Sequence, residues 1–217
     1  MFPWRRNRKA ADSEGQQRAS LAMLHVGRCG STVVGRMLSD HPDVFWDREI
    51  FEPHRRTELD EPVDLPPNQL IRHRQAQTPL HYGFETKYLQ SHHLGRLGLT
   101  LPDYISILQG LGFNRFVALH RRNYLRRVVS GAIGRASGTW HRTRGSATTS
   151  ASITLDPHKV PFGPRKPLLD VFAELSEGER ALRELLPPSD TLWLTYEDDI
   201  ERDPSIAYRR VCGLFGV

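Results

Sequence analysis

The turn at residues 27–32, Gly-Arg-Cys-Gly-Ser-Thr, has the residue types and spacing of an anion-binding site. An apolar run at residues 21–26 leads into the turn, and an amphipathic pattern follows it. A turn between a strand and a helix directs free backbone N–H groups and the positive end of the helix dipole at one point. Arg28 adds a positive charge there, and Ser31 and Thr32 add hydroxyl groups. We therefore expect the turn to bind a phosphate or sulfate group, as in a protein that handles a nucleotide-like anion.

A second basic turn, His120-Arg121-Arg122-Asn123, also follows an apolar run and precedes a helical pattern. Ser130 lies inside that pattern, eight positions after Arg122. Eight helical residues rise about 12 Å, so these two residues can hold one phosphate only if the arginine folds back along the helix. In the alternative interpretation, Ser130 bonds to a preceding backbone carbonyl. Neither turn has the G-x-x-x-x-G-K-[ST] pattern of a Walker A loop, because the first turn contains no lysine.

Strands and helices alternate along the chain and must position these turns. Apolar runs predict strands at residues 21–26, 43–46, 81–88, 113–120 and 191–196. Periodicity predicts helices at residues 32–39, 100–110, 123–136, 167–186 (as one helix, or as two broken at Gly178) and from 204 onward. This alternation predicts an α/β sandwich with a mainly parallel central sheet. Ligands in such sheets bind at the carboxyl ends of the strands, so both basic turns should lie on that edge.

Local signals define the ends and faces of these helices. Thr100 and Asp203 can each cap a helix, and each is followed by a proline in the first turn. The apolar residues of the helix that starts near Asn123 predict a buried stripe made of Leu125, Val128, Val129, Ala132, Ile133 and Ala136. Residues 52–79 are rich in Pro, Arg, Glu and Gln and predict a surface excursion with a helical turn at 68–74.

The composition suits one compact domain in a reducing compartment. The chain has 217 residues, of which 38% are hydrophobic, and a formal net charge of +5. We expect residues 1–18 to be a flexible basic tail, and residues 19–217 to be one domain with irregular insertions at about 52–79 and 141–166. The two cysteines form no metal-binding or disulfide pattern. Because no apolar run approaches the roughly 18 residues that span a membrane, and the N-terminus has no signal-peptide pattern, we expect a cytoplasmic protein.

The two turns together resemble those of the sulfotransferases that use 3′-phosphoadenosine 5′-phosphosulfate as donor. In that family a Lys/Arg-x-Gly-Ser/Thr turn holds the 5′-phosphosulfate, and an arginine and a serine eight positions later hold the 3′-phosphate, the spacing of Arg122 and Ser130. Further similar segments are His41-Pro42-Asp43-Val44 followed by Arg48-Glu49-Ile50-Phe51, then Gly83-Phe84-Glu85-Thr86-Lys87, then Gly138-Thr139-Trp140-His141, then Tyr196-Glu197-Asp198. The third and fourth of these are most similar to the bacterial trehalose sulfotransferase branch.

The resemblance implies a P-loop-NTPase-like three-layer sandwich and in-line transfer of a sulfuryl group to a hydroxyl of a small-molecule, carbohydrate or glycolipid acceptor. The products would be the sulfated acceptor and adenosine 3′,5′-bisphosphate, and no metal would be required. The residues implied to hold the donor are Gly27, Arg28, Cys29, Gly30, Ser31, Thr32, Arg122 and Ser130. Cysteine stands at position 29, where small hydroxyl residues are frequent in the family. The trehalose branch also suggests a homodimer.

The resemblance also implies catalytic roles. Arg28 would stabilise the negative charge that develops on the bridging oxygen as the sulfuryl group leaves. Lys87 would face that group, or else cap a strand end. Glu49 would accept the proton of the acceptor hydroxyl, and its other interpretation is a surface salt bridge with Arg48. The alternative bases are His25, His120 and His141. The acceptor would contact Glu49, Phe51, Trp140 and His141.

Other functions remain open on the sequence alone. A P-loop-like small-molecule kinase is disfavoured by the missing Walker lysine, whereas a non-catalytic relative would bind the nucleotide only. Nucleic-acid binding agrees with the net charge, but the basic residues are spread along the chain and form no known motif, so we expect no nucleic-acid partner. The acidic run at residues 197–201 predicts a salt-bridge cluster rather than a metal site. Many sulfotransferases cover the donor with a further C-terminal segment, and here either the branch does without it or residues 142–166 cover the donor.

Overall fold

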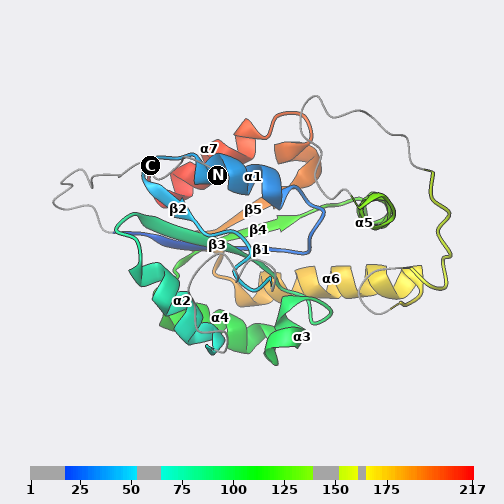
Figure 1. Cartoon of the computed structure of the whole chain (residues 1–217), viewed down its shortest axis with the longest axis horizontal. Coiled ribbons are helices and arrows are strands. Elements are labelled where there is room, and N and C mark those ends of the chain that lie inside the picture. Colours follow the sequence, from blue (N-terminus) through cyan, green and yellow to red (C-terminus); the bar gives the residue numbers. More distant parts are fainter. Residues whose placement is uncertain (1–17, 53–64, 139–151, 161–164) are drawn as a thin grey trace.

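The central sheet contains five parallel strands in the order β2-β3-β1-β4-β5 (Figure 1). This computed structural model describes residues 18–52, 65–138, 152–160 and 165–217. The strands are β1 (Ser20–His25), β2 (Val44–Trp46), β3 (His81–Lys87), β4 (Arg115–His120) and β5 (Thr191–Thr195). The predicted α/β class with a parallel central sheet is therefore confirmed.

Helices cover both faces of the sheet and complete a three-layer sandwich (Figure 1). One face carries α1 (Ser31–Ser39) and α7 (Ser205–Phe215). The other face carries α2 (Pro67–Ala76), α3 (His93–Leu97), α4 (Leu101–Gly110) and α6 (Leu168–Leu185), and α5 (Tyr124–Ser137) adds Val128 to the same core. The short elements η2 (Pro188–Asp190) and η3 (Tyr196–Ile200) flank β5. No helix of the described segments is long and apolar enough to cross a membrane.

The central strand β1 shows why the sequence specifies this layering. Leu21 and Met23 belong to the core under α1 and α7, whereas Ala22 and Leu24 belong to the core under α4 and α6. Side chains alternate between the faces of a strand, so a continuous apolar run is the pattern of a strand covered on both sides. The strand is buried at each of its residues, and His25 at its end is the one ionisable group among them.

The order of the strands creates a crevice between β1 and β4. The chain leaves β1 through α1 toward β2 on one side of the sheet, and leaves β4 through α5 toward β5 on the other side. Ligands of open parallel sheets bind at such a switch point, outside the carboxyl ends of the strands. The two basic turns follow these two adjacent strands, as the sequence predicted.

Most helix boundaries agree with the expectations, the structure decides one alternative that the sequence left open, and one detail was wrong. The side chain of Thr100 accepts the N–H of Asp103, and Asp203 accepts the N–H of Ser205, as capping predicts. Helix α6 runs unbroken through Gly178, because that glycine serves close packing: a Cβ there would lie 2.5 Å from Leu89 Cδ2.

The apolar stripe predicted for α5 is the detail that was wrong. Leu125 is 49% exposed and Ala136 is exposed. Val128 and Ala132 are buried as predicted, and the other buried residues of the helix are Arg127, Gly131 and Gly134. The buried face is thus rotated toward small residues and one arginine, because α5 packs against the loop after β1 rather than only against apolar side chains.

Gly35 should be intolerant of a side chain because α1 approaches the sheet closely at this residue. A Cβ there would overlap Glu85 Oε1 and lie 2.7 Å from Trp46 Nε1. We expect Gly35→Ala to destabilise the protein by about 1–3 kcal/mol in urea unfolding, as overpacking does. The control is Gly213→Ala in α7, where a Cβ meets nothing within 4 Å and should stabilise by about 0.5–1 kcal/mol. Equal effects of the two substitutions would contradict this packing.

Candidate functional site

The loop after β1 folds into a left-handed turn. The φ angles of Gly27, Arg28 and Gly30 are 75°, 56° and 92°. Glycine adopts such angles without strain, whereas a residue with a side chain does so uncommonly. A Cβ at Gly30 would also lie 2.9 Å from Ile200, so the loop packs closely against η3. Helix α1 starts directly after the turn without a side-chain cap at Gly30, which directs its N-terminus at the switch point.

Arg127 holds this loop from below. Its guanidinium is fully buried, and it donates from Nε to Gly27 O over 3.0 Å and from Nη2 to Val26 O. Burial lowers the pKa of Arg127 to about 10, so the group stays charged at neutral pH. Because both carbonyls point inward to this cation, the turn keeps its conformation and gains positive charge beneath it. The sequence analysis did not identify Arg127, and the only signal is its place within an apolar helical pattern.

Arg28 joins the loop to α5. Its Nε and Nη2 donate to Ser130 Oγ over 3.1 and 2.8 Å. Arg121 donates from Nη1 to Arg28 O over 3.3 Å, and its guanidinium lies 4.2 Å from the centre of the Tyr196 ring. Burial, together with the charge of Arg121, lowers the pKa of Arg28 from its ordinary value. Three arginines therefore gather around the switch point, the kind of charge that an anion would neutralise.

Arg122 is held by acidic residues of η3. Its guanidinium makes two hydrogen bonds to Asp198, at 2.8 and 2.7 Å. Glu197 accepts the backbone N–H groups of Arg122 and Asn123 over 3.1 and 3.2 Å. In this structure Arg122 and Ser130 thus have different partners, Asp198 and Arg28. The predicted salt-bridge cluster of residues 197–201 is confirmed, since Asp199 and Glu201 also pair with arginines, Arg210 and Arg126.

A second group of charges lies at the ends of β2 and β3, around Lys87. The Nζ atom of Lys87 is 2.7 Å from Glu49 Oε2 and 2.9 Å from Glu52 Oε1. Burial lowers the pKa of Lys87, but the two carboxylates more than offset this and raise it above its ordinary value. The side chain of Lys87 also lies against residues 27–32, the turn after β1 that we call the anion loop. A Cβ at Gly27 would lie 3.5 Å from Lys87 Cε. Glu49 therefore pairs with Lys87 rather than with Arg48, and both predicted catalytic residues lie next to the loop.

Two buried histidines orient these carboxylates. His25 Nδ1 accepts the N–H of Gly27 over 3.0 Å, and His93 Nδ1 accepts the N–H of Lys87 over 3.1 Å. In the neutral ring the proton then lies on Nε2. His25 Nε2 is 3.8 Å from Glu49 Oε1 and 3.5 Å from Glu85 Oε2. His93 Nε2 is 3.1 Å from Glu52 Oε1.

These tautomers bear on metal binding. The trios His25, Glu49, Glu85 and Glu49, Glu52, His93 have the residue types of metal ligands, with their atoms within 4.8 Å of one another. However, both Nε2 atoms that face the carboxylates are protonated in the neutral rings, and a metal needs an unprotonated nitrogen. The ammonium of Lys87 also lies between Glu49 and Glu52. The hydrogen bonding therefore favours a charge-paired cluster over a metal centre.

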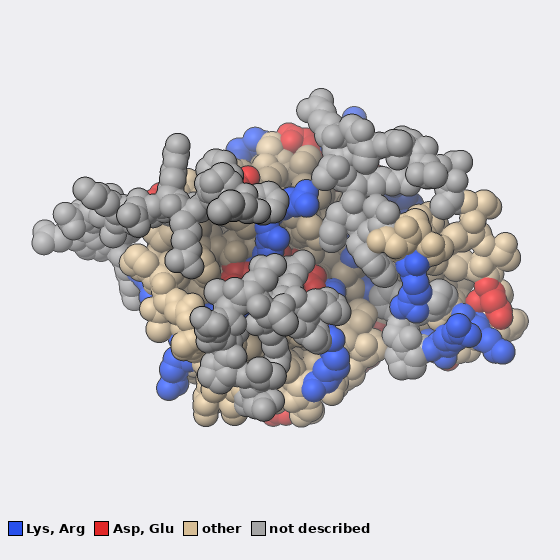
Figure 2. Space-filling view, viewed as in Figure 1, with Lys and Arg blue, Asp and Glu red and all other residues tan. Residues whose placement is uncertain are grey.

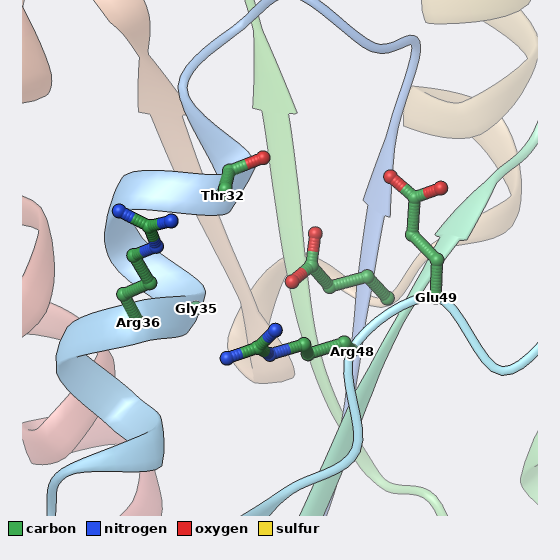
Figure 3. A pocket seen from close by; sticks show the side chains of 6 residues that line it. Thr32, Gly35, Arg36, Arg48 and Glu49 are labelled. Atoms are coloured by element: carbon green, nitrogen blue, oxygen red, sulfur yellow. The ribbon is translucent and has the colours of Figure 1, made fainter. Parts of the chain in front are cut away.

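A small pocket opens beside this cluster (Figure 3). Thr32, Gly35 and Arg36 of α1 line one side, and Arg48, Glu49 and Glu85 line the other. In the space-filling view, basic and acidic side chains lie close together near the middle of the molecule (Figure 2). The residues Arg36 and Arg48 were not among the predicted site residues.

Of the residues predicted to contact the acceptor, Phe51 lies elsewhere, and two other predicted site residues, Cys29 and His120, lie away from the pocket. Phe51 is 3% exposed and packs against Phe84, His93 and Tyr104, so it belongs to the core rather than to the pocket. Cys29 of the turn is also buried, and burial raises the pKa of its thiol to about 11. His120 lies near Thr195 and Glu179, away from the Lys87 cluster. Trp140 and His141 lie outside the described residues.

Comparisons with known proteins agree with this architecture. No family model and no curated protein sequence matches the chain. The structure resembles a sulfotransferase from Alicyclobacillus acidocaldarius, with 14% identity, a TM-score of 0.54, and coverage of 93% of this chain and 82% of the other. The chain has a sulfotransferase fold.

Two further solved sulfotransferase domains show the same likeness. The domain of the Synechococcus PCC 7002 olefin synthase has 16% identity and a TM-score of 0.52, with coverage of 94% of this chain and 75% of that one. The domain from the curacin biosynthetic pathway has 14% identity and a TM-score of 0.51, with coverage of 93% and 75%. At such identities the likeness concerns the fold.

Arg127 should be necessary for the shape of the anion loop. Arg127→Met conserves much of the volume but leaves two buried carbonyls without their donor, which should destabilise the protein by about 2 kcal/mol or more in urea unfolding. Arg127→Lys should not restore stability, because an ammonium cannot serve both carbonyls with the geometry of a guanidinium fork. The control Arg126→Met, on the exposed neighbour that pairs with Glu201, should leave unfolding nearly unchanged. Full stability of Arg127→Met would contradict the role assigned to it.

The buried histidines should make stability depend on pH. Burial lowers the pKa of both His25 and His93 below the ordinary value of 6.5. A depressed pKa stabilises the protein above the unfolded-state pKa, and this contribution is lost as pH falls, because the unfolded chain then binds more protons. For each histidine, the free energy of unfolding should fall by up to about 1.4 kcal/mol for each pH unit below about pH 6.5.

His93→Gln should therefore flatten the loss of unfolding free energy measured between about pH 7 and about pH 5. His73→Gln, at an exposed position of α2, controls for the loss of a histidine. An identical slope in wild type and His93→Gln would mean that His93 is not held neutral.

Proposed function

We propose that this chain transfers a sulfuryl group from 3′-phosphoadenosine 5′-phosphosulfate to a hydroxyl of a small-molecule or carbohydrate-like acceptor. The observation that carries the proposal is the contact of Arg28 with Ser130. It joins the loop after β1 to the helix after β4 at the switch point, where a ligand of such a sheet binds. The sulfotransferase fold supports the same reading.

The donor would span the two basic turns. Its 5′-phosphosulfate would lie on the backbone of residues 27–32, with the hydroxyls of Ser31 and Thr32 as further donors. Its 3′-phosphate would lie near Ser130 and Arg122. Because Asp198 holds Arg122 in this structure, the phosphate would have to replace that carboxylate. The pair is more than half exposed on both sides, and an exposed ion pair costs little to break.

The transfer itself would use the residues between the loop and the pocket. The acceptor oxygen would form a bond to sulfur while the bond from sulfur to the bridging oxygen breaks, and the electron pair of that bond would stay on the departing phosphate. Arg28 and Lys87 would stabilise the negative charge on that oxygen and on the sulfuryl group. Glu49 would take the hydroxyl proton at Oε1, since Oε2 is bonded to Lys87.

Donor preference separates this function from its alternatives. Adenosine 3′,5′-bisphosphate should raise the melting temperature strongly, whereas ATP with Mg²⁺ should have little effect, because a ligand stabilises in proportion to its affinity for the folded state. The opposite order would favour a small-molecule kinase. Binding of the bisphosphate without transfer of labelled sulfate to any acceptor would favour a non-catalytic relative.

Glu49→Gln should lower kcat by roughly 10²–10⁴-fold, the usual contribution of a general base, and should leave the affinity for the bisphosphate largely unchanged. The measurement is transfer of radiolabelled sulfate to an acceptor found by mass spectrometry. The control is Glu184→Gln, on the exposed face of α6. Undiminished transfer by Glu49→Gln would exclude Glu49 as the base.

A further inference from the structure

Two arginines border the small pocket beside Glu49 without a partner of opposite charge. Arg36 comes from α1 and Arg48 from the segment after β2, and both line the pocket (Figure 3). Both are exposed, and within the described segments neither makes a side-chain hydrogen bond or an ion pair. This contrasts with Arg28, Arg122 and Arg127, which each have partners.

The backbone at Arg48 is shaped to present its side chain. Its φ angle is 53°, which is uncommon for a residue other than glycine and costs of order 1 kcal/mol or more. The carbonyl of Arg48 accepts the N–H of Glu85 over 2.7 Å, which fixes the turn against β3. Successive side chains of an extended strand point in opposite directions, whereas this turn lets Arg48 and Glu49 line the same pocket.

Arg36 completes the rim from the opposite side. It lies one helical turn after Thr32 on the same face of α1, and both residues line the pocket. Gly35 leaves space for the carboxylate of Glu85, because a side chain at this position would overlap it. Two arginines from two separate elements therefore line one pocket.

The carboxylates of the pocket do not use these cations. Glu49 is bonded to Lys87, and Glu85 accepts Trp46 Nε1 over 3.0 Å. Arg36 and Arg48 thus leave positive charge at the edge of the pocket, whereas Glu49 and Glu85 already accept hydrogen bonds from other residues. An oxyanion of a ligand is the chemical group that guanidinium groups without a partner bind best.

We propose that the acceptor is itself an anion, with a carboxylate, phosphate or sulfate group that Arg36 and Arg48 bind while its hydroxyl meets Glu49. This inference rests on the proposed function, because it assigns the substrate class of the same site. It makes Arg36 and Arg48 specificity residues, which recognise the acceptor without taking part in the transfer.

Matched acceptor pairs test the proposal. Phenyl β-glucuronide and phenyl β-glucoside differ mainly by a carboxylate, and glucose 6-phosphate and glucose differ by a phosphate. We expect wild type to favour the anionic member, in kcat/KM for sulfate transfer or in calorimetric binding to the complex with adenosine 3′,5′-bisphosphate. The variants Arg36→Gln and Arg48→Asn should each reduce this preference about 10- to 100-fold, as expected for loss of a hydrogen bond between charged groups. Asparagine is chosen because it tolerates a positive φ.

The controls separate the possible failures. Arg72→Gln, at an exposed position of α2 outside the pocket, removes the same charge and should leave the preference intact. Added salt should weaken the preference, because the two guanidiniums are exposed. Equal use of both members of each pair, or a preference that survives both substitutions, overturns the inference. Weaker binding of the bisphosphate by both variants overturns it too, since the arginines would then belong to the donor site. Absence of any bisphosphate binding by wild type would instead remove the proposed function.

Discussion

The bond from Arg127 to the carbonyls of Val26 and Gly27 is the constraint on which the site depends. Burying a guanidinium is costly unless each of its donors finds an acceptor. Two donors of Arg127, Nε and Nη2, find acceptors in backbone carbonyls of the loop after β1, and the helix that carries the arginine follows β4. One side chain therefore fixes the loop conformation, joins the two halves of the sheet at the switch point, and leaves positive charge under the turn. Arg28 makes a second link between this loop and α5, because it donates two hydrogen bonds to Ser130.

The loop after β1 is also linked by hydrogen bonds to the carboxylates around Lys87. The N–H of Gly27 determines which nitrogen of His25 carries the proton, and that proton faces Glu49 and Glu85. The N–H of Lys87 does the same for His93 and Glu52. A change in the loop would therefore alter the hydrogen bonding around Glu49, so the donor site and the candidate base are parts of one network. Networks of this kind can be worth more than the sum of their pairs, because each bond orients the next.

Sequence patterns predicted the sheet, the helices and the two turns because each depends on local signals. Apolar runs of about six residues, caps such as Thr100, and glycines at left-handed positions act within a few residues of themselves. They also suggested Glu49 and Lys87, since short motifs carry these residues. The pairing of the two was not predictable, because their contact joins segments that are 38 positions apart.

The arginines show the limit of sequence reasoning most clearly. Of adjacent Arg126 and Arg127, one is paired at the surface and the other is fully buried, and only the packing of α5 distinguishes them. The same holds for Phe51, whose type suits an acceptor wall but whose ring fills the core. Burial and partner choice are set by tertiary contacts, which residue type alone does not specify.

A crystal structure of the complex with adenosine 3′,5′-bisphosphate tests the central claim most directly. The account predicts the 5′-phosphate on the backbone of residues 27–32, with Arg127 still bonded to the two carbonyls, and the 3′-phosphate at Ser130 and Arg122, with Asp198 displaced. A nucleotide bound away from the β1–β4 switch point, or an anion loop that contacts no phosphate, would contradict it.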